Sequence, residues 1–300
     1  MINYTLKYST MTKSNDQSTI MNTTLPVNAK VPINRCNLPA EVLGDLSFQT
    51  NPKSLYIDGV NQLHCRFFQQ LDMESDAGAR AHWFLQHMSA HFRLDNLEEA
   101  GYDTAMSVDR SRANFLRVLR GWFFDSDSVE GAVIKSWVES RFGLIPRYHQ
   151  GPIRNIEDDA YSRFASQSSR GLYNTNALEA QLDLLYSFCQ YELSRRFPQE
   201  KSIVLYRGQN SLQSLEQLPI QKGDIDSKSS MTLLLNNVSS FTSDLSRAGE
   251  FGDMIISSEV PFAKLLFFSG LMPGIMTSER EYAVIGGLYN VKLIIDLGNQ

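Results

Sequence analysis

The sequence predicts an α+β fold, in which a helical N-terminal half packs on a C-terminal mixed or antiparallel β-sheet. Apolar residues recur at helical spacing from about residue 58 to residue 197. Short apolar runs between turn residues follow from about residue 200. Because the helices come first and the strands later, this order favours α+β over a doubly wound parallel sheet.

Three of the expected helices have clear limits. The first is expected to be capped by Asp109, the second to end before Gly143, and the third to run from about Asn176 to Phe197, where Pro198 stops it. The apolar stripes of the first two are Phe115, Val118, Leu119 and Trp122, and Val133, Ile134, Trp137 and Val138.

The expected strands are short apolar runs, and some of them are expected to be buried. They cover residues 202–206, 231–235, 254–260, 264–268, 282–287 and 288–296. We therefore divide the chain into a mainly helical region, 36–198, and a strand-rich region, 199–300. The boundary near residue 198 separates either two domains or two layers of one domain. Residues 1–35 are rich in Ser, Thr, Asn and Lys without an apolar period, which predicts a disordered or loosely attached tail.

Composition excludes several classes of protein. The formal net charge is -5 with scattered Lys and Arg, so neither a nucleic-acid binder nor a binder of anionic membranes is expected. The longest apolar run, 265–276, is broken by Gly and Pro and is too short to span a bilayer. Three widely spaced cysteines in no paired motif favour reduced thiols, and hence a cytoplasmic protein.

Common cofactor and metal motifs are missing from the sequence. There is no Rossmann or P-loop glycine pattern, no zinc motif and no serine-hydrolase elbow. The best metal candidate is the pair His87 and His91, four residues apart, with His82 nearby. Without a spaced third ligand we expect no metal, and we interpret these side chains as partly buried or surface histidines.

Three fragments of the strand-rich region stand out as a possible site. They are Leu205-Tyr206-Arg207-Gly208, Ser239-Ser240-Phe241-Thr242-Ser243 with Ala248 and Phe251-Gly252 after it, and Glu279-Arg280-Glu281-Tyr282. Each has an ordinary explanation by itself: a surface charge, a turn or helix cap, and a solvated strand edge. Residues 244–250, for example, are expected to form a short helix capped by Thr242 or Ser243.

Together the three fragments resemble the arginine–serine–glutamate signature of mono-ADP-ribosyltransferases, and the Glu-x-Glu form is the one associated with arginine as acceptor. A longer resemblance, from about Cys36 to Val291, is to the dinitrogenase reductase ADP-ribosyltransferase family. It is carried by the stretches LPAEVLGDLSFQ, DRSRANFLRVLRGWFFD, KSWVESRFGLIPRYH, RGLYNTNALEAQLDLLYSFCQYEL, LYRGQN, LLNNVSSFTSD and EYAVIGG.

The resemblance implies a fold, an activity and partners. The implied fold of residues 199–300 is a split-sheet, NAD-binding catalytic core of ADP-ribosyltransferase type. The implied activity is transfer of ADP-ribose from NAD, as substrate, to an arginine of the nitrogenase iron protein, which inactivates that protein and so regulates nitrogen fixation. The resemblance also implies regulation through a PII signalling protein.

The family pattern implies roles for the two glutamates. Glu281 would stabilise the oxocarbenium-like transition state and hold the ribose 2′-hydroxyl. Glu279 would orient the acceptor guanidinium and help to remove its proton. On an extended strand these two side chains share a face, because residues i and i+2 point the same way.

The other candidate residues would hold NAD. Arg207 suits bidentate contacts to a phosphate or to the nicotinamide ribose, and Gly208 would let its backbone approach the nicotinamide amide. The serine stretch departs from the family's Ser-Thr-Ser and reads Phe241-Thr242-Ser243, or starts at Ser240 in a shifted register. Which hydroxyl acts stays open. Phe241 either stacks on nicotinamide or packs in the core.

Two other functions remain alternatives. In an NAD glycohydrolase, water would replace the protein acceptor. A non-catalytic module would bind NAD or a partner without releasing nicotinamide.

Overall fold

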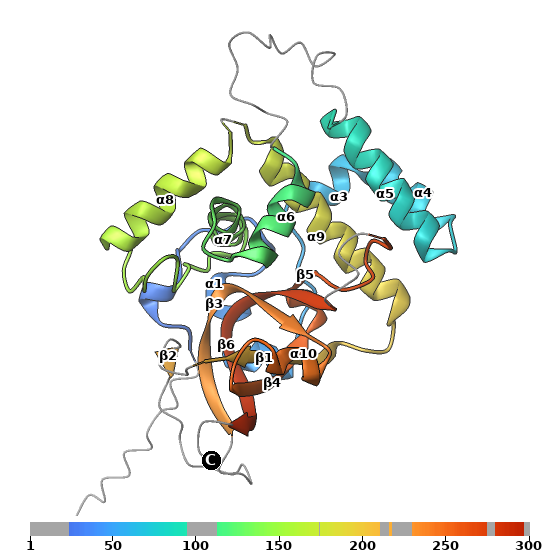
Figure 1. Ribbon diagram of the computed structural model, residues 1–300. Coiled ribbons are helices and arrows are strands. Elements are labelled where there is room, and N and C mark those ends of the chain that lie inside the picture. The colour runs from blue at the N-terminus through green and yellow to red at the C-terminus, as the bar shows by residue number, and fades with distance from the viewer. Residues whose placement is uncertain are drawn as a thin grey trace, which may run out of the picture.

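The computed structural model describes residues 24–94, 113–173, 175–210, 216–217, 230–274 and 280–296. Most of the described helices come first in the chain and the strands later, and they form two layers (Figure 1). The α+β prediction is therefore confirmed. Helices α6, α7 and α9 lie next to the sheet, whereas α3, α4, α5 and α8 lie farther out.

The larger helices of the described chain match the periodic segments closely. They are α5 (Ala77–Phe92), α6 (Phe115–Phe124), α7 (Val129–Phe142), α8 (Asp159–Gly171) and α9 (Ala177–Arg196). The shorter ones are α1 (Ala40–Leu43), α2 (Leu46–Thr50), α3 (Val60–Leu63), α4 (Cys65–Asp72) and α10 (Leu245–Gly249), with 3-10 turns η1 (Val27–Ala29) and η4 (Phe262–Lys264). Gly143 ends α7 at φ 72, as predicted. The cap of α6 is Asn114, whereas Asp109, the predicted cap, lies outside the described residues.

All strand pairs in the described chain are antiparallel. The strands are β1 (Ser202–Gln209), β2 (Glu216–Gln217), β3 (Ser230–Thr242), β4 (Met254–Pro261), β5 (Leu265–Phe267) and β6 (Glu281–Asp296). Their order is β2-β3-β1-β4-β6-β5, with β3 also paired to β6. β1 pairs with β4 over eight residues, but its register with β3 is the single pair Tyr206 and Thr242.

The two strands expected at 282–287 and 288–296 are one strand, β6. The glycines between them do not end the strand. They lack a side chain, so the strand can pass close to the backbone of Asn236 and of Gly44. A Cβ at Gly286 would lie 2.0 Å from the carbonyl oxygen of Asn236, and Gly287 has φ 110. Asn236 and Asn237 form an irregularity in β3 opposite these glycines, and the Asn237 amide donates to the backbone of Lys135 in α7 (2.7 Å).

Helix α9 is the centre of the helical layer, and three of its buried polar side chains each bind a different helix. Gln181 accepts a hydrogen bond from the backbone N–H that begins α6 (2.9 Å). Asp183 accepts one from Arg141 in α7 (2.7 Å), and Glu192 accepts one from Arg80 in α5 (2.6 Å). These charges are paired, which offsets the cost of burying them.

The packed part of the chain begins before residue 36, contrary to the predicted extent of the tail. Leu25 and Ala29 are buried in the main core, and the backbone N–H of Val31 donates to the carbonyl of Gly143 (2.9 Å). One hydrophobic core includes residues from both the helical and the strand-rich regions.

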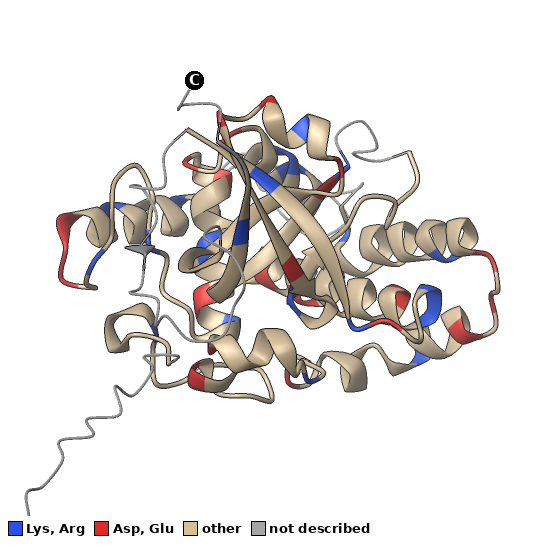
Figure 2. Ribbon diagram, turned by 90° about the horizontal axis from the view of Figure 1, so that it is seen from below, with Lys and Arg blue, Asp and Glu red and all other residues tan. Residues whose placement is uncertain are grey.

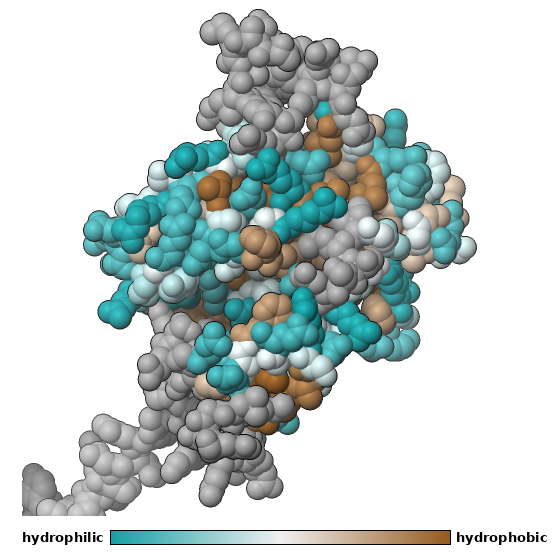
Figure 3. All heavy atoms as spheres, viewed as in Figure 1, coloured by the Kyte–Doolittle hydropathy of each residue, from teal (hydrophilic) through white to brown (hydrophobic). Residues whose placement is uncertain are grey.

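The distribution of charged and apolar residues agrees with the composition. Acidic and basic residues are interspersed in the view of Figure 2, and apolar residues form separate patches in that of Figure 3. Among the described residues, no helix combines the length and the apolar character needed to cross a bilayer. Cys36, Cys65 and Cys189 are free thiols.

Candidate active site

The strand register brings the three predicted fragments into one pocket of about 360 Å³. Tyr206 of β1 lies opposite Thr242 of β3, and Thr242 lies opposite Glu281 of β6. Arg207, Ser240 and Glu281 therefore line the same cavity, although they come from three different strands. The volume lies within the range of about 300–1,000 Å³ that is usual for small-ligand sites.

Arg207 lies in the wall of this pocket. Its Nη1 donates to the backbone carbonyl of Ser240 (2.6 Å) and to the Ser240 hydroxyl (3.2 Å). Burial lowers the pKa of Arg207 to about 10, so the guanidinium remains cationic at neutral pH. No carboxylate among the described residues forms an ion pair with it, and it can therefore bind an anionic or oxygen-rich ligand.

The serine stretch divides between pocket and surface. Ser240, Phe241 and Thr242 line the pocket, whereas Ser243 is exposed and is not part of the lining. Phe241 belongs to the main core and also lines the cavity. Core packing is therefore confirmed for this ring, and stacking on nicotinamide stays a prediction. The Thr242 hydroxyl accepts a hydrogen bond from the backbone N–H of Asp244 (3.1 Å).

The short helix expected after the serine stretch is α10, but its cap is Asp244 rather than Thr242 or Ser243. The Asp244 carboxylate accepts from the backbone N–H of Ser246 (2.9 Å) and also pairs with Arg280 (3.1 Å). A carboxylate is a better acceptor than a hydroxyl for the exposed N–H groups at a helix start, and it also suits the helix dipole. This pair ties the start of α10 to the start of β6.

Glu281 is the first residue of β6 and is 9% exposed. The residue before it, Arg280, has φ 46, in the left-handed region. Glu279 lies outside the described residues, so its predicted position on the same face as Glu281 remains a prediction.

Gly208 lines the pocket and also lies against the backbone of α10. A Cβ at this position would lie 1.9 Å from the backbone oxygen of Ala248 in α10. The sequence suggested that a missing side chain lets nicotinamide approach; the structure gives the close approach of α10 as a physical reason for glycine here. Ala248 and Phe251, which follow the serine stretch, line the pocket as well.

Comparison with known proteins identifies the family of the chain. The model of the dinitrogenase reductase ADP-ribosyltransferase family matches residues 33–293. The chain is 36% identical over 262 residues to the NAD(+)–dinitrogen-reductase ADP-D-ribosyltransferase of Rhodospirillum rubrum, covering 86% of this chain and 93% of that protein. No solved structure matches the chain. The chain belongs to the dinitrogenase reductase ADP-ribosyltransferase family.

In this family member the helical layer supplies one wall of the pocket, which the sequence did not indicate. The residues are Trp122, Phe123, Phe124, Asp125 and Ser126, at the end of α6 and in the turn after it. Trp122 is 2% exposed, whereas Phe124 is 95% exposed. The run Trp122-Phe123-Phe124 was a signal for this wall. Successive residues of a helix point in different directions, so three aromatic side chains in a row cannot all face one core.

The turn that carries this wall is anchored to α7. Lys135, whose side chain is fully buried, donates from Nζ to Asp127 (3.1 Å) and lies 3.2 Å from Nδ1 of His149. Burial lowers the pKa of Lys135, and Asp127 opposes that change. Since Asp127 is thereby fixed, Asp125 and Ser126 are held in the wall of the pocket.

Proposed function

We propose that the pocket binds NAD and that this protein transfers ADP-ribose from NAD to an arginine of dinitrogenase reductase, the nitrogenase iron protein. The observation that carries the proposal is the meeting of Arg207, Ser240 and Glu281 in one pocket of a member of this family. This modification would inactivate the iron protein and so regulate nitrogen fixation.

The reaction breaks the bond between C1′ of the ribose and the nicotinamide nitrogen, and nicotinamide leaves as a neutral base. Positive charge develops on the ribose as this bond breaks. The Glu281 carboxylate, at the start of β6, is placed to stabilise that charge and to bind the 2′-hydroxyl. Arg207 is cationic and suits the phosphate or the ribose oxygens.

The acceptor nitrogen then forms the new bond to C1′, and the guanidinium gives up one proton. An arginine side chain is almost wholly protonated at neutral pH and is a poor nucleophile. We propose that Glu279 orients it and accepts that proton. Gly208, Ser240, Phe241 and Thr242 complete the proposed NAD site, and Ser243 follows this stretch outside the pocket lining.

The single contact between β1 and β3, beside the pocket, supports a split-sheet core of ADP-ribosyltransferase type within residues 199–300. Because Trp122 and its neighbours line the same cavity, we propose that this core and the helical region 36–198 act as one unit. The family resemblance supports a PII signalling protein as a regulatory partner, which co-purification with this chain would test.

The test is transfer of label from radiolabelled NAD to purified nitrogenase iron protein by wild type, Glu281→Gln and Glu279→Gln. Loss of a group that stabilises transition-state charge costs on the order of 10²–10³-fold in rate. We expect a loss of this size for Glu281→Gln in both transfer and nicotinamide release, and for Glu279→Gln mainly in transfer. Glu259→Gln is the matched control, since Glu259 is an exposed carboxylate of β4 outside the pocket.

The outcomes separate the alternatives. If wild type released nicotinamide but left the iron protein unlabelled, the protein would be an NAD glycohydrolase. Saturable NAD binding without nicotinamide release, with the iron protein and a PII protein present, would indicate a binding module. Unchanged transfer by Glu281→Gln would show that the charge is stabilised by another residue.

A further inference from the structure

Three histidine side chains meet at a place that is separate from the NAD pocket. His87 and His91 lie one turn apart on α5, and His64 lies at the junction of α3 and α4. One ring nitrogen of each lies within 4.8 Å of the others, and Nδ1 of His64 is 3.1 Å from Nε2 of His87. The sequence suggested His82 as the neighbour, but His82 bonds Gln86 (2.9 Å), and the third member of the cluster is His64.

The spacing of these nitrogens is close to that of a metal site. Two imidazole nitrogens at 2.0–2.1 Å from a tetrahedral zinc ion are roughly 3.3–3.4 Å apart. The pair His64 and His87 is already near this distance. His91 is exposed, so its ring can turn the remaining ångström or so without disturbing the core.

Two of the three rings are fixed in place by packing. His64 is 5% exposed, and the His87 ring stacks on Phe67 at 4.2 Å with an interplanar angle of 11°. A metal bound here would therefore meet two rings that are already held in position.

A hydrogen bond between His64 and His87 would explain why these two rings lie together, but it would not explain the position of His91 beside them. The ring of His91 lies 4.9 Å from that of His64 and 5.5 Å from that of His87. Three imidazoles that share one point match the all-nitrogen donor set preferred by zinc and similar transition metals rather than by Mg²⁺ or Ca²⁺.

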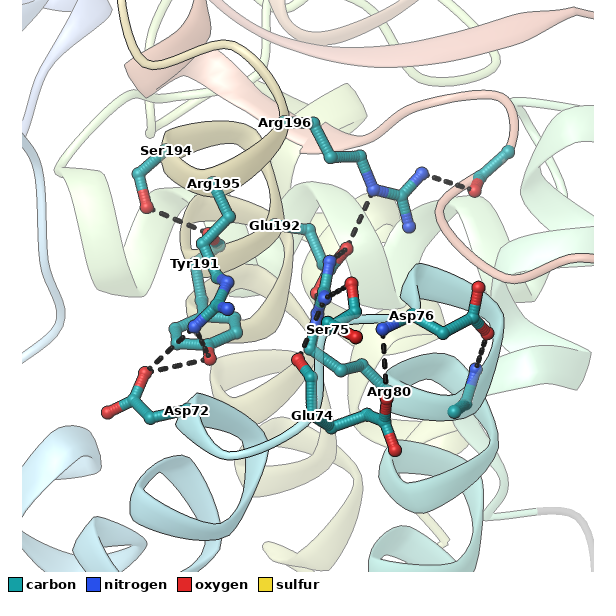
Figure 4. Close-up of polar contacts among 12 residues, drawn as sticks. Asp72, Glu74, Ser75, Asp76, Arg80, Tyr191, Glu192, Ser194, Arg195 and Arg196 are labelled. Atoms are coloured by element: carbon teal, nitrogen blue, oxygen red, sulfur yellow. Dashed lines mark hydrogen bonds and ion pairs between the residues drawn. The ribbon is translucent and has the colours of Figure 1, made fainter.

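We propose that His64, His87 and His91 bind one Zn²⁺ ion, with the fourth position left to solvent. The ion would join the start of α4 to the end of α5. These helices form a hairpin whose turn, at residues 73–76, is held by α9 through Arg80, Glu192 and Tyr191 (Figure 4). The histidines lie at the other, open end of the hairpin, so the metal would close it.

The experiment uses the full chain, treated with a chelator and then exchanged into metal-free buffer at pH 7.5. Zn²⁺ is titrated in by calorimetry, and Co²⁺ is added separately, because its visible absorption reports tetrahedral nitrogen ligation. The variants are His91→Ala, whose exposed side chain should be dispensable for folding, and His82→Ala, an exposed histidine of the same helix. Circular dichroism verifies that each variant is folded.

We expect wild type and His82→Ala to bind one Zn²⁺ per chain, to develop the Co²⁺ absorption and to melt at a higher temperature with Zn²⁺. For His91→Ala we expect at least a tenfold weaker affinity and no absorption band. Equal binding by His91→Ala and wild type would overturn the proposal, as would loss of binding in His82→Ala or no binding by wild type. None of these readouts depends on NAD or on transfer, so they test the metal site independently of the proposed function.

Discussion

The substitution Gly208→Ala tests whether the contact between β1 and α10 shapes the pocket. The added Cβ would lie 1.9 Å from the backbone oxygen of Ala248, whereas a carbon and an oxygen in ordinary contact are about 3.3 Å apart. The two backbone segments must therefore separate by roughly 1.4 Å. The obstructing atom belongs to the backbone, so no side chain can rotate out of the way.

The magnitude follows from the elements that have to move. Overpacking of this kind costs about 1–3 kcal/mol, or a fall in melting temperature of roughly 2–6 °C at about 2 °C per kcal/mol for a chain of this size. α10 and the turn after it carry Ala248 and Phe251 into the pocket. A displacement of about 1 Å in a binding site can reduce the rate on the order of 10²-fold.

The assays are thermal unfolding and NAD-dependent transfer, with Gly249→Ala as the matched control. A Cβ at Gly249 would lie 3.7 Å from the nearest atom, in Ile255, which is an ordinary contact. Alanine also favours a helix over glycine by about 1 kcal/mol, so this control should be neutral or slightly stabilising. The reasoning is refuted if Gly208→Ala keeps the wild-type melting temperature and transfer rate.

Two further predictions concern buried charges in the two layers. Glu192→Ala leaves the guanidinium groups of Arg80 and Arg196 without their carboxylate, which should cost about 3–5 kcal/mol and lower the melting temperature by roughly 6–10 °C. The control is Glu41→Gln, which removes the ion pair of an exposed carboxylate and should change stability by less than about 1 kcal/mol. Similar melting temperatures for the two variants would contradict the argument. Burial lowers the pKa of Lys264 to about 7 from its ordinary value of 10.5. The unfolded chain then binds more protons between these values, so Lys264 should make stability rise with pH from about 7 to 10, by at most about 1.4 kcal/mol per pH unit. Urea unfolding at pH 7, 8 and 9 checks this, because the difference between wild type and Lys264→Met should change with pH, and a constant difference would show that the pKa is not lowered.

Local features of the fold could be predicted because their causes are local. The stripe of α6 and the glycine that ends α7 depend on residues only a few positions apart. The single strand β6 could not be predicted, because the role of Gly286 is to let the strand pass the backbone of Asn236, which is distant in the sequence. The packing of Leu25 was missed for a similar reason, since isolated apolar residues in a polar stretch carry no period.

The site shows the same division between local and distant causes. That Arg207, Ser240 and Glu281 lie together could be predicted from motifs, because each motif includes its own strand context, whereas the roles of these residues remain predictions. His64 could not be assigned to His87, because only the path of α4 and α5 brings these two rings together.

The wall formed by Trp122 and Phe123 shows why the helical layer is required for the pocket as well as for stability. Trp122 lines the cavity and also belongs to the main core. Phe123 lines the cavity too, and its ring packs at 5.9 Å from that of Phe267 in β5. The residues that face the cavity are thus the same residues that join the helices to the sheet. Without them β5 would lose a packing partner and the pocket would lose a wall, so residues 199–300 alone cannot reproduce this pocket.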